Sequence, residues 1–253
     1  MNDERLPLHG KTLPAIDWRR SGRRIHLDPT ADDLAQYQVY RYCSLPEALQ
    51  LFGRGQWSFA HPTTWPDKYE HHLSRELFGA QGPYAGTQVH VKCLSVEYAS
   101  HALWRTYAGP IGVLRIGIAL QDLVAMLAAA KLPAGSQLYI TRVRYLDERN
   151  LQREVAKLVK AGTSDIDATM RALALKRAGF AYENELRICL ATPGAGTPDP
   201  IRIVSGLKAA RVKSVQIDPY LPPWQAEEIR RVLVQHVGDG ARVVQSRFDA
   251  DVD

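Results

Sequence analysis

The sequence lacks the features that would indicate a membrane protein or a disulfide-rich secreted one. No apolar run reaches the ~18 residues that a membrane-spanning helix needs. Cys43, Cys93 and Cys189 are odd in number and far apart, which favours reduced thiols over a disulfide framework. The N-terminus also lacks the basic flank and apolar stretch of a signal peptide. We therefore expect a cytoplasmic protein with no membrane partner.

Common nucleotide, nucleophile and metal motifs are missing as well. The sequence contains no G-x-G-x-x-G fingerprint, no P-loop and no G-x-S-x-G elbow, so the Rossmann, P-loop ATPase and α/β-hydrolase classes lose their main support. Zinc spacing is absent. Asp67, Glu70, His71 and His72 lie close together, but adjacent histidines point in different directions on a helix or strand. We interpret this segment as a loop surface and predict no metal.

What is present is an ordinary globular composition with a mild basic excess. Of the 253 residues, 45% are hydrophobic, which is enough to form a sizeable core. The chain has 32 Lys and Arg residues and 27 Asp and Glu residues. Much of the excess sits at Arg19, Arg20, Arg23 and Arg24. We expect residues 1–36 to form a basic, irregular arm that adds nothing to folding. The arm is either a solvated surface or a phosphate-seeking segment that docks nucleic acid.

Residues 37–253 show strand and helix patterns without regular βαβ alternation, which predicts a single α+β domain with a mixed or antiparallel sheet flanked by helices. Ser44 and Glu47 form a capping box that opens a helix, which Gly53 and Gly55 end. Further helical patterns cover 98–108, 120–131, 148–160, 164–177 and 223–237. Strand patterns cover 38–43, 56–60, 88–95, 111–118, 137–145, 183–190, 201–204, 212–217 and 241–245.

The strand predicted at 183–190 is the most informative segment for function. On a strand, Glu183, Glu185 and Arg187 share one face, while the apolar residues between them face the other way. Two carboxylates roughly 7 Å apart repel each other, so we expect Arg187 to pair with one and to leave the other available. The alternative is a solvent-exposed strand face with ordinary surface ion pairs.

Two aromatic segments are further candidates for binding. Tyr40-Arg41-Tyr42 places an arginine between two aromatics on a strand that enters the capped helix, where a ligand phosphate or ribose could be held. The alternative is an edge-strand arginine. Trp104 and Tyr107 stand three residues apart on a predicted helix, a spacing more typical of core packing than of a stacking platform.

Taken in order, these segments resemble the bacterial domain of unknown function 2971, over roughly residues 38 to 236. Pro66 and Lys68 depart from that pattern, which usually has Asn and Pro there. The resemblance is carried by Val39-Tyr40-Arg41-Tyr42, Ser44-Leu45, Glu47-Ala48-Leu49, Trp57-Ser58-Phe59, Pro62, Trp65 to Glu70, Cys93-Leu94-Ser95, Leu103 to Ala108, Gly112, Lys176, Phe180, Tyr182-Glu183, Glu185 and Arg187.

The same layout is similar to the split β-sheet of ADP-ribosyltransferases. That similarity implies an NAD-using enzyme of bacterial toxin or phage-defence type, with a nucleotide or nucleic acid as a candidate acceptor. Breaking the nicotinamide glycosidic bond builds an oxocarbenium-like centre, which a carboxylate stabilises. Glu185 would be that carboxylate, Glu183 would tune it or orient the acceptor, and Arg187 and Lys176 would support both. The implied NAD-binding residues are Tyr40, Arg41, Tyr42, Ser58, Trp104 and Tyr107.

Two other classes remain open, and they need different residues. A non-catalytic nucleotide-binding or interaction module would keep Arg41 and the aromatics but would need neither glutamate. In the transferase, by contrast, the strand near residue 40 and the strand near residue 185 should line a common cleft. A metal-dependent nuclease would hold a divalent ion near a phosphate, with Lys176 and the arginine cluster on the backbone. Its ligands would be Asp67, Glu70, Glu183 and Glu185.

Overall fold

The computed structural model describes most of the chain, and it forms two compact units. The first unit comprises 1–33, 59–93 and 133–202, and the second comprises 34–58, 94–132 and 203–253. Helices combine with both parallel and antiparallel strand pairs, so the predicted α+β class with a mixed sheet is confirmed. The described residues are 19–21, 25–27, 38–65, 67–78, 82, 86–98, 100–107, 113–160, 170, 172–194, 199–238 and 241–247.

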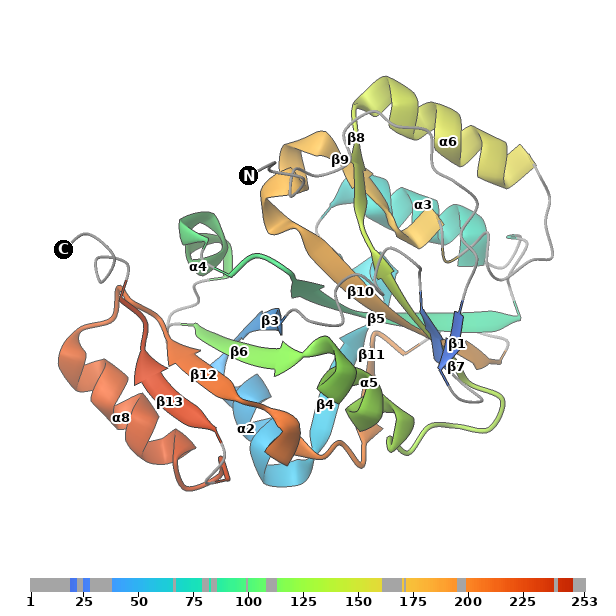
Figure 1. Ribbon diagram of the computed structural model, residues 1–253. Helices are drawn as coiled ribbons and strands as arrows, with labels where there is room; N and C mark the ends of the chain where they lie inside the picture. The colour runs from blue at the N-terminus through green and yellow to red at the C-terminus, as the bar shows by residue number, and fades with distance from the viewer. Residues whose placement is uncertain are drawn as a thin grey trace. The chain divides into compact units, whose positions relative to one another are not determined.

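The strands of the first unit follow the order β1-β2-β7-β10-β5 (Figure 1). β2 is parallel to β7, and β7 is antiparallel to β10. β10 is buried along nearly its whole length, and β7 and β5 are its neighbours in the sheet. The bounds are β1 Arg19–Ser21, β2 Ile25–Leu27, β5 Thr87–Ser95, β7 Gln137–Arg142 and β10 Glu185–Pro193.

Two helices and a short parallel strand pair complete the first unit. The apolar face of α3 packs Leu73 and Leu77 with Tyr139 of β7 and Cys189 of β10. Leu151 of α6 packs with β8 and β9 in a second apolar cluster. The bounds are α3 Lys68–Phe78, α6 Glu148–Lys160, β8 Arg144–Leu146 and β9 Leu175–Arg177.

In the second unit, β3, β6, β12 and β13 follow one another in the sheet (Figure 1). The first two pairings are antiparallel and the last is parallel. β4, β5 and β11 cross the unit boundary within their own length. The bounds are β3 Gln38–Cys43, β4 Gln56–Ala60, β6 Leu114–Ala119, β11 Ile201–Ser205, β12 Ser214–Ile217, β13 Arg242–Gln245, α2 Leu45–Arg54, α4 His101–Tyr107, α5 Leu120–Ala128 and α8 Pro223–Leu233.

Both ends of α2 follow the sequence signals. The N–H of Glu47 donates to the Ser44 hydroxyl over 3.4 Å, which satisfies one orphan donor of the first turn. Gly55 ends the helix with φ 60°. A Cβ there would lie 2.7 Å from the carbonyl oxygen of Leu207, so this turn requires glycine. The predicted start at Ser44 and end at Gly55 are confirmed, whereas Gly53, also expected to end the helix, lies within its last turn.

The N-terminal segment corrects one prediction. β1 and β2 lie inside the predicted irregular arm, and Ile25 of β2 is only 2% exposed. The expectation that this segment is irregular is therefore wrong for β1 and β2, and the burial of Ile25 argues against the expectation that the segment adds nothing to folding. Arg23 and Arg24 lie outside the described residues, and only the backbone of Arg19 and Arg20 is described. A role of the arginines in binding nucleic acid stays a prediction.

Three other segments also differ from the sequence prediction. Residues 68–72, interpreted as part of a loop, open α3. Residues 175–177, expected at the end of a helix, form β9, because they pair in parallel with β8. Glu183 closes a 3-10 helix, η2 (Ala178–Glu183), instead of opening a strand. Among the helices within the described residues, none is long and apolar enough to cross a membrane.

Candidate active site

The predicted catalytic residues of the first unit meet around Lys176 of β9. Its ammonium group donates to Glu183 over 2.9 Å and also to Glu185. Arg187 donates through Nε to Glu185 over 2.8 Å and through another guanidinium nitrogen to Glu70 of α3. All five side chains are buried. The prediction that Arg187 pairs with one of the two glutamates is confirmed, but the other is held by Lys176.

A turn at Asn184 separates the two glutamates that the sequence places on one strand face. Asn184 adopts the left-handed conformation, with φ 41°, and β10 begins only at Glu185. The N–H of Glu185 donates to the Tyr145 hydroxyl over 2.8 Å. Glu183, from the end of η2, and Glu185, from the start of β10, are thus joined through Lys176 rather than aligned along a strand. Tyr145 carried no sequence signal for this position.

The loop before α3 brings Glu70 into this cluster. Asp67 caps the helix, since its Oδ1 accepts from the N–H groups of Tyr69 and Glu70 over 2.8 and 3.3 Å. Its other oxygen accepts from Arg177 over 2.7 Å. The ring of Trp65 lies 4.7 Å from the Arg187 guanidinium, a cation–π contact. The Asp67–Glu70 segment therefore has a structural role that sequence reasoning missed.

Charge within the cluster separates the two glutamates in pKa. Burial and the hydrogen bond and charge of Glu185 raise the pKa of Glu183 to about 8. Burial alone would also raise the pKa of Glu185, but the charges of Arg187 and Lys176 outweigh it and hold that pKa well below its usual range. Three carboxylates share two cations, so one proton restores neutrality. The raised pKa of Glu183 and the lowered pKa of Glu185 make Glu183 the group that favours this proton, while Glu185 favours its ionised form.

The predicted NAD-binding residues belong to the second unit, and several are engaged with one another. Arg41 holds Glu47 with two hydrogen bonds of 3.0 Å. Tyr42 contacts Trp104 edge-on at 5.0 Å between ring centroids and stacks with Tyr107 at 6.1 Å. Tyr42 and Trp104 are buried, so these two rings serve as core packing.

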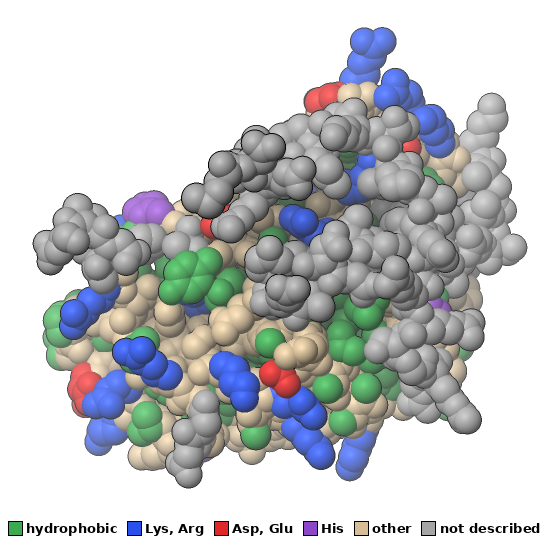
Figure 2. Space-filling view, in the orientation of Figure 1, with side chains coloured by type: hydrophobic (Ala, Val, Ile, Leu, Met, Phe, Trp, Pro, Cys, Tyr) green, Lys and Arg blue, Asp and Glu red, His purple; other side chains and the backbone are tan. Residues whose placement is uncertain are grey.

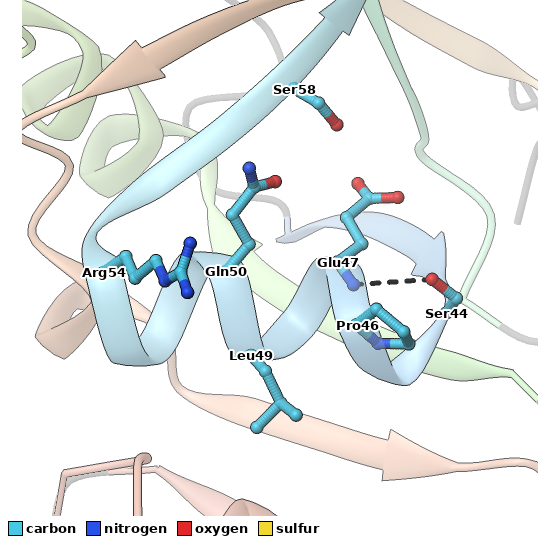
Figure 3. A pocket seen from close by; sticks show the side chains of 7 residues that line it. All are labelled: Ser44, Pro46, Glu47, Leu49, Gln50, Arg54 and Ser58. Carbon is cyan, nitrogen blue, oxygen red and sulfur yellow. Dashed lines mark hydrogen bonds between the residues drawn. The ribbon is translucent and has the colours of Figure 1, made fainter.

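Ser58 is another of the predicted NAD-binding residues. It lines a cavity of about 540 Å³ beside α2. Figure 3 shows the carboxylate of Glu47 and the amide of Gln50 on the side of the helix that faces Ser58. Glu47 is also the ion-pair partner of Arg41. Of the predicted binding residues, Ser58 therefore lines the cavity itself, and Arg41 contacts a residue that lines it. The full lining is Ser44, Pro46, Glu47, Leu49, Gln50, Arg54 and Ser58.

The structure thus brings the predicted site residues together in two groups, one within each unit. Lys176, Glu183, Glu185 and Arg187 meet in the first unit. The predicted NAD-binding residues fall in the second unit. A common cleft lined by β3 and β10 stays a prediction.

The carboxylates of the nuclease alternative are occupied by cationic side chains. Glu70 and Glu185 accept from Arg187, and Asp67 accepts from Arg177. A divalent ion would have to compete with these guanidinium groups and with Lys176 for the same oxygens. Within the described part of the chain, no group of three or more His, Cys, Asp or Glu has an arrangement suited to a metal ion.

The family models and the curated proteins were both compared with this chain. No model of a known protein family matches the chain, and no curated protein matches it either. The resemblance to the domain of unknown function 2971 stays a prediction.

Proposed function

We propose that the chain is an ADP-ribosyltransferase-like enzyme that uses NAD as substrate, with Glu183 as the catalytic carboxyl group. The observation that carries this proposal is the pair Glu183 and Glu185, whose pKa values are driven apart around Lys176. Pairs of titratable groups separated in this way are typical of acid–base sites. The resemblance of the Glu-x-Glu segment to that of ADP-ribosyltransferases supports the same class.

The proposed reaction needs a negative charge and a proton acceptor. The bond between ribose C1′ and the nicotinamide nitrogen breaks, and its electron pair leaves on nicotinamide. An acceptor oxygen or nitrogen then bonds to C1′ and gives its proton to ionised Glu183. The developing positive charge on the ribose is stabilised by the permanent charge of Glu185. Glu183 acts as general base only after losing its own proton, so the rate should rise with pH through about 8.

Accessibility favours Glu183 over Glu185 for contact with a substrate. The two oxygens of Glu185 accept from Lys176 and Arg187, respectively. Glu183 is buried too, but it is flanked by exposed Tyr182 and half-buried Asn184. We therefore propose that Glu185 keeps the electrostatic role expected from the sequence, while Glu183 is the carboxyl group that contacts the acceptor and takes its proton.

The acceptor and the cellular setting belong to this proposal. We propose that the acceptor is a nucleotide or a nucleic acid. We also propose that the enzyme is cytoplasmic and belongs to a toxin or phage-defence system. The three cysteines, Cys43, Cys93 and Cys189, form no disulfide with one another, which supports a reducing compartment. Burial raises the pKa of Cys93 far above its usual value, with the charge of Glu185 adding to the effect. This thiol therefore stays protonated and takes no part as a nucleophile.

The test is release of nicotinamide from NAD, with and without cell extract as a source of acceptor. Glu183→Gln should reduce release by about 10²-fold or more while NAD affinity, measured by calorimetry, stays nearly constant. Glu228→Gln, an exposed position on α8, is the matched control and should behave like the wild type. If the wild type releases no nicotinamide with any acceptor and does not bind NAD, the transferase proposal is wrong, and the nucleotide-binding module takes its place.

A further inference from the structure

A cavity of about 830 Å³ in the second unit lies among β12, β13 and α8. Its volume falls in the range of about 300–1,000 Å³ that is usual for small-molecule sites. We propose that this cavity binds a nucleoside phosphate. The proposal does not rest on the carboxylates of the first unit or on NAD turnover.

The lining of this cavity carries an excess of positive charge. Four arginines and a single carboxylate, Glu227, contribute to it. Arg230 is already paired with Glu227 over 2.6 Å. Arg242 and Arg247 are exposed, and no ion pair of either is found within the described residues. Basic side chains lie at the lower left of the space-filling view (Figure 2), where the ribbon diagram in the same orientation shows α8 and β13 (Figure 1). An anion is therefore the ligand charge that the cavity favours.

Arg115 strengthens this argument because it is buried. Only 3% of this residue is exposed, and it forms no ion pair with a carboxylate of the described chain. One guanidinium nitrogen donates to Gln216, and the group lies 4.8 Å from the ring centroid of Tyr98 and 4.9 Å from that of Tyr40. Aromatic rings stabilise such a cation only in part. A phosphate in the cavity would supply the missing negative charge.

Tyr98 supplies the feature that distinguishes a nucleotide from a simple anion. Its side chain lines the cavity and is 60% exposed, although one contact of the ring is with Arg115. An exposed aromatic ring next to arginines is a platform on which a base stacks while its phosphate meets the cations. Stacking is worth about 1–3 kcal/mol per base, so the ring should contribute measurably to affinity.

The experiment measures ADP binding to the full chain by calorimetry, with inorganic phosphate and adenosine as separate probes. ADP should bind more tightly than either probe, and added salt should weaken it. Arg242→Gln and Arg247→Gln should each weaken ADP binding by about tenfold. Tyr98→Ala should weaken ADP binding without changing that of phosphate. Arg231→Gln, on the same helix as Arg230 but outside the cavity lining, is the charge-matched control and should bind ADP like the wild type.

Three results would overturn the proposal. The first is no binding of ADP to the wild type, and the second is equal ADP affinity of the wild type and both cavity arginine variants. The third is phosphate binding as tight as that of ADP together with no effect of Tyr98→Ala, which would indicate a simple anion site.

Discussion

Arg187 and Glu70 form a buried ion pair although 117 positions separate them in the sequence. The same guanidinium group donates to Glu185 and to the carbonyl oxygen of Leu173. It thereby joins α3, β10 and the segment that precedes β9 within the first unit. Only 1% of the Arg187 side chain is exposed, so water cannot replace any of these partners.

The first prediction is that Arg187→Met lowers the free energy of unfolding by about 3–5 kcal/mol, because Glu70 and Glu185 lose a buried cation. Urea unfolding followed by circular dichroism measures this change. Arg187→Lys keeps the charge but not the forked geometry, so its stability should lie between that of the wild type and that of Arg187→Met. Arg231→Met, at an exposed position, should change stability by no more than about 0.5 kcal/mol. Equal midpoints for Arg187→Met and the wild type would contradict a stabilising role of the cluster.

Local signals were sufficient to predict much of the fold. The strands at 38–43 and 56–60 and the helix at 148–160 have the predicted bounds, because period and composition are properties of the segment itself. The Ser44 cap is equally local. The Glu183 to Arg187 segment was also identified correctly as a place where charges meet.

The remaining differences arise from contacts that no local pattern contains. Leu175-Lys176-Arg177 continues a helical pattern, but pairing with β8 makes it a strand. Lys176 consequently lies between Glu183 and Glu185, which a helix ending there does not predict. Glu70 reaches Arg187 only because α3 packs on the same core as β10. The left-handed turn at Asn184 likewise removes Glu183 from the strand face.

The second prediction concerns the pH dependence of stability. In the native state the pKa of Glu183 is about 8, above the ordinary value of 4.5. The folded protein therefore binds more protons than the unfolded chain between these two values, and Glu183 contributes stability that is lost as pH rises through about 8. Glu183→Gln, which cannot ionise, should lose less stability than the wild type between pH 5 and pH 9. Urea unfolding across this range measures the difference, and parallel curves for the two proteins would contradict it.

The third prediction concerns β2. Ile25→Ala should lower the free energy of unfolding by about 2–5 kcal/mol, because it leaves a cavity in the core beside β7. Deleting residues 1–30 should lower the melting temperature for the same reason. Ile203→Ala, on a strand but 45% exposed, is the matched control and should have a clearly smaller effect. A truncated chain that melts at the wild-type temperature would show that β2 adds nothing to the stability of the fold.

The fourth prediction decides whether Arg41 serves the fold or a ligand. Its paired hydrogen bonds to Glu47 are partly buried, with 17% and 16% of the two side chains exposed. A double-mutant cycle with Arg41→Gln, Glu47→Gln and the double variant should therefore give a coupling free energy of about 0.5–3 kcal/mol in urea unfolding. NAD affinity, measured on the same four proteins, supplies the second readout.

If Arg41 only supports the fold, NAD affinity should be equal in all four proteins. If Arg41 instead holds a phosphate of NAD, Glu47→Gln should leave it free for the ligand and strengthen binding, while Arg41→Gln should weaken it. The pairing with Glu47 leads us to expect the first result, because a guanidinium group committed to a carboxylate on two nitrogens must give up that partner before it can bind a phosphate in the same way.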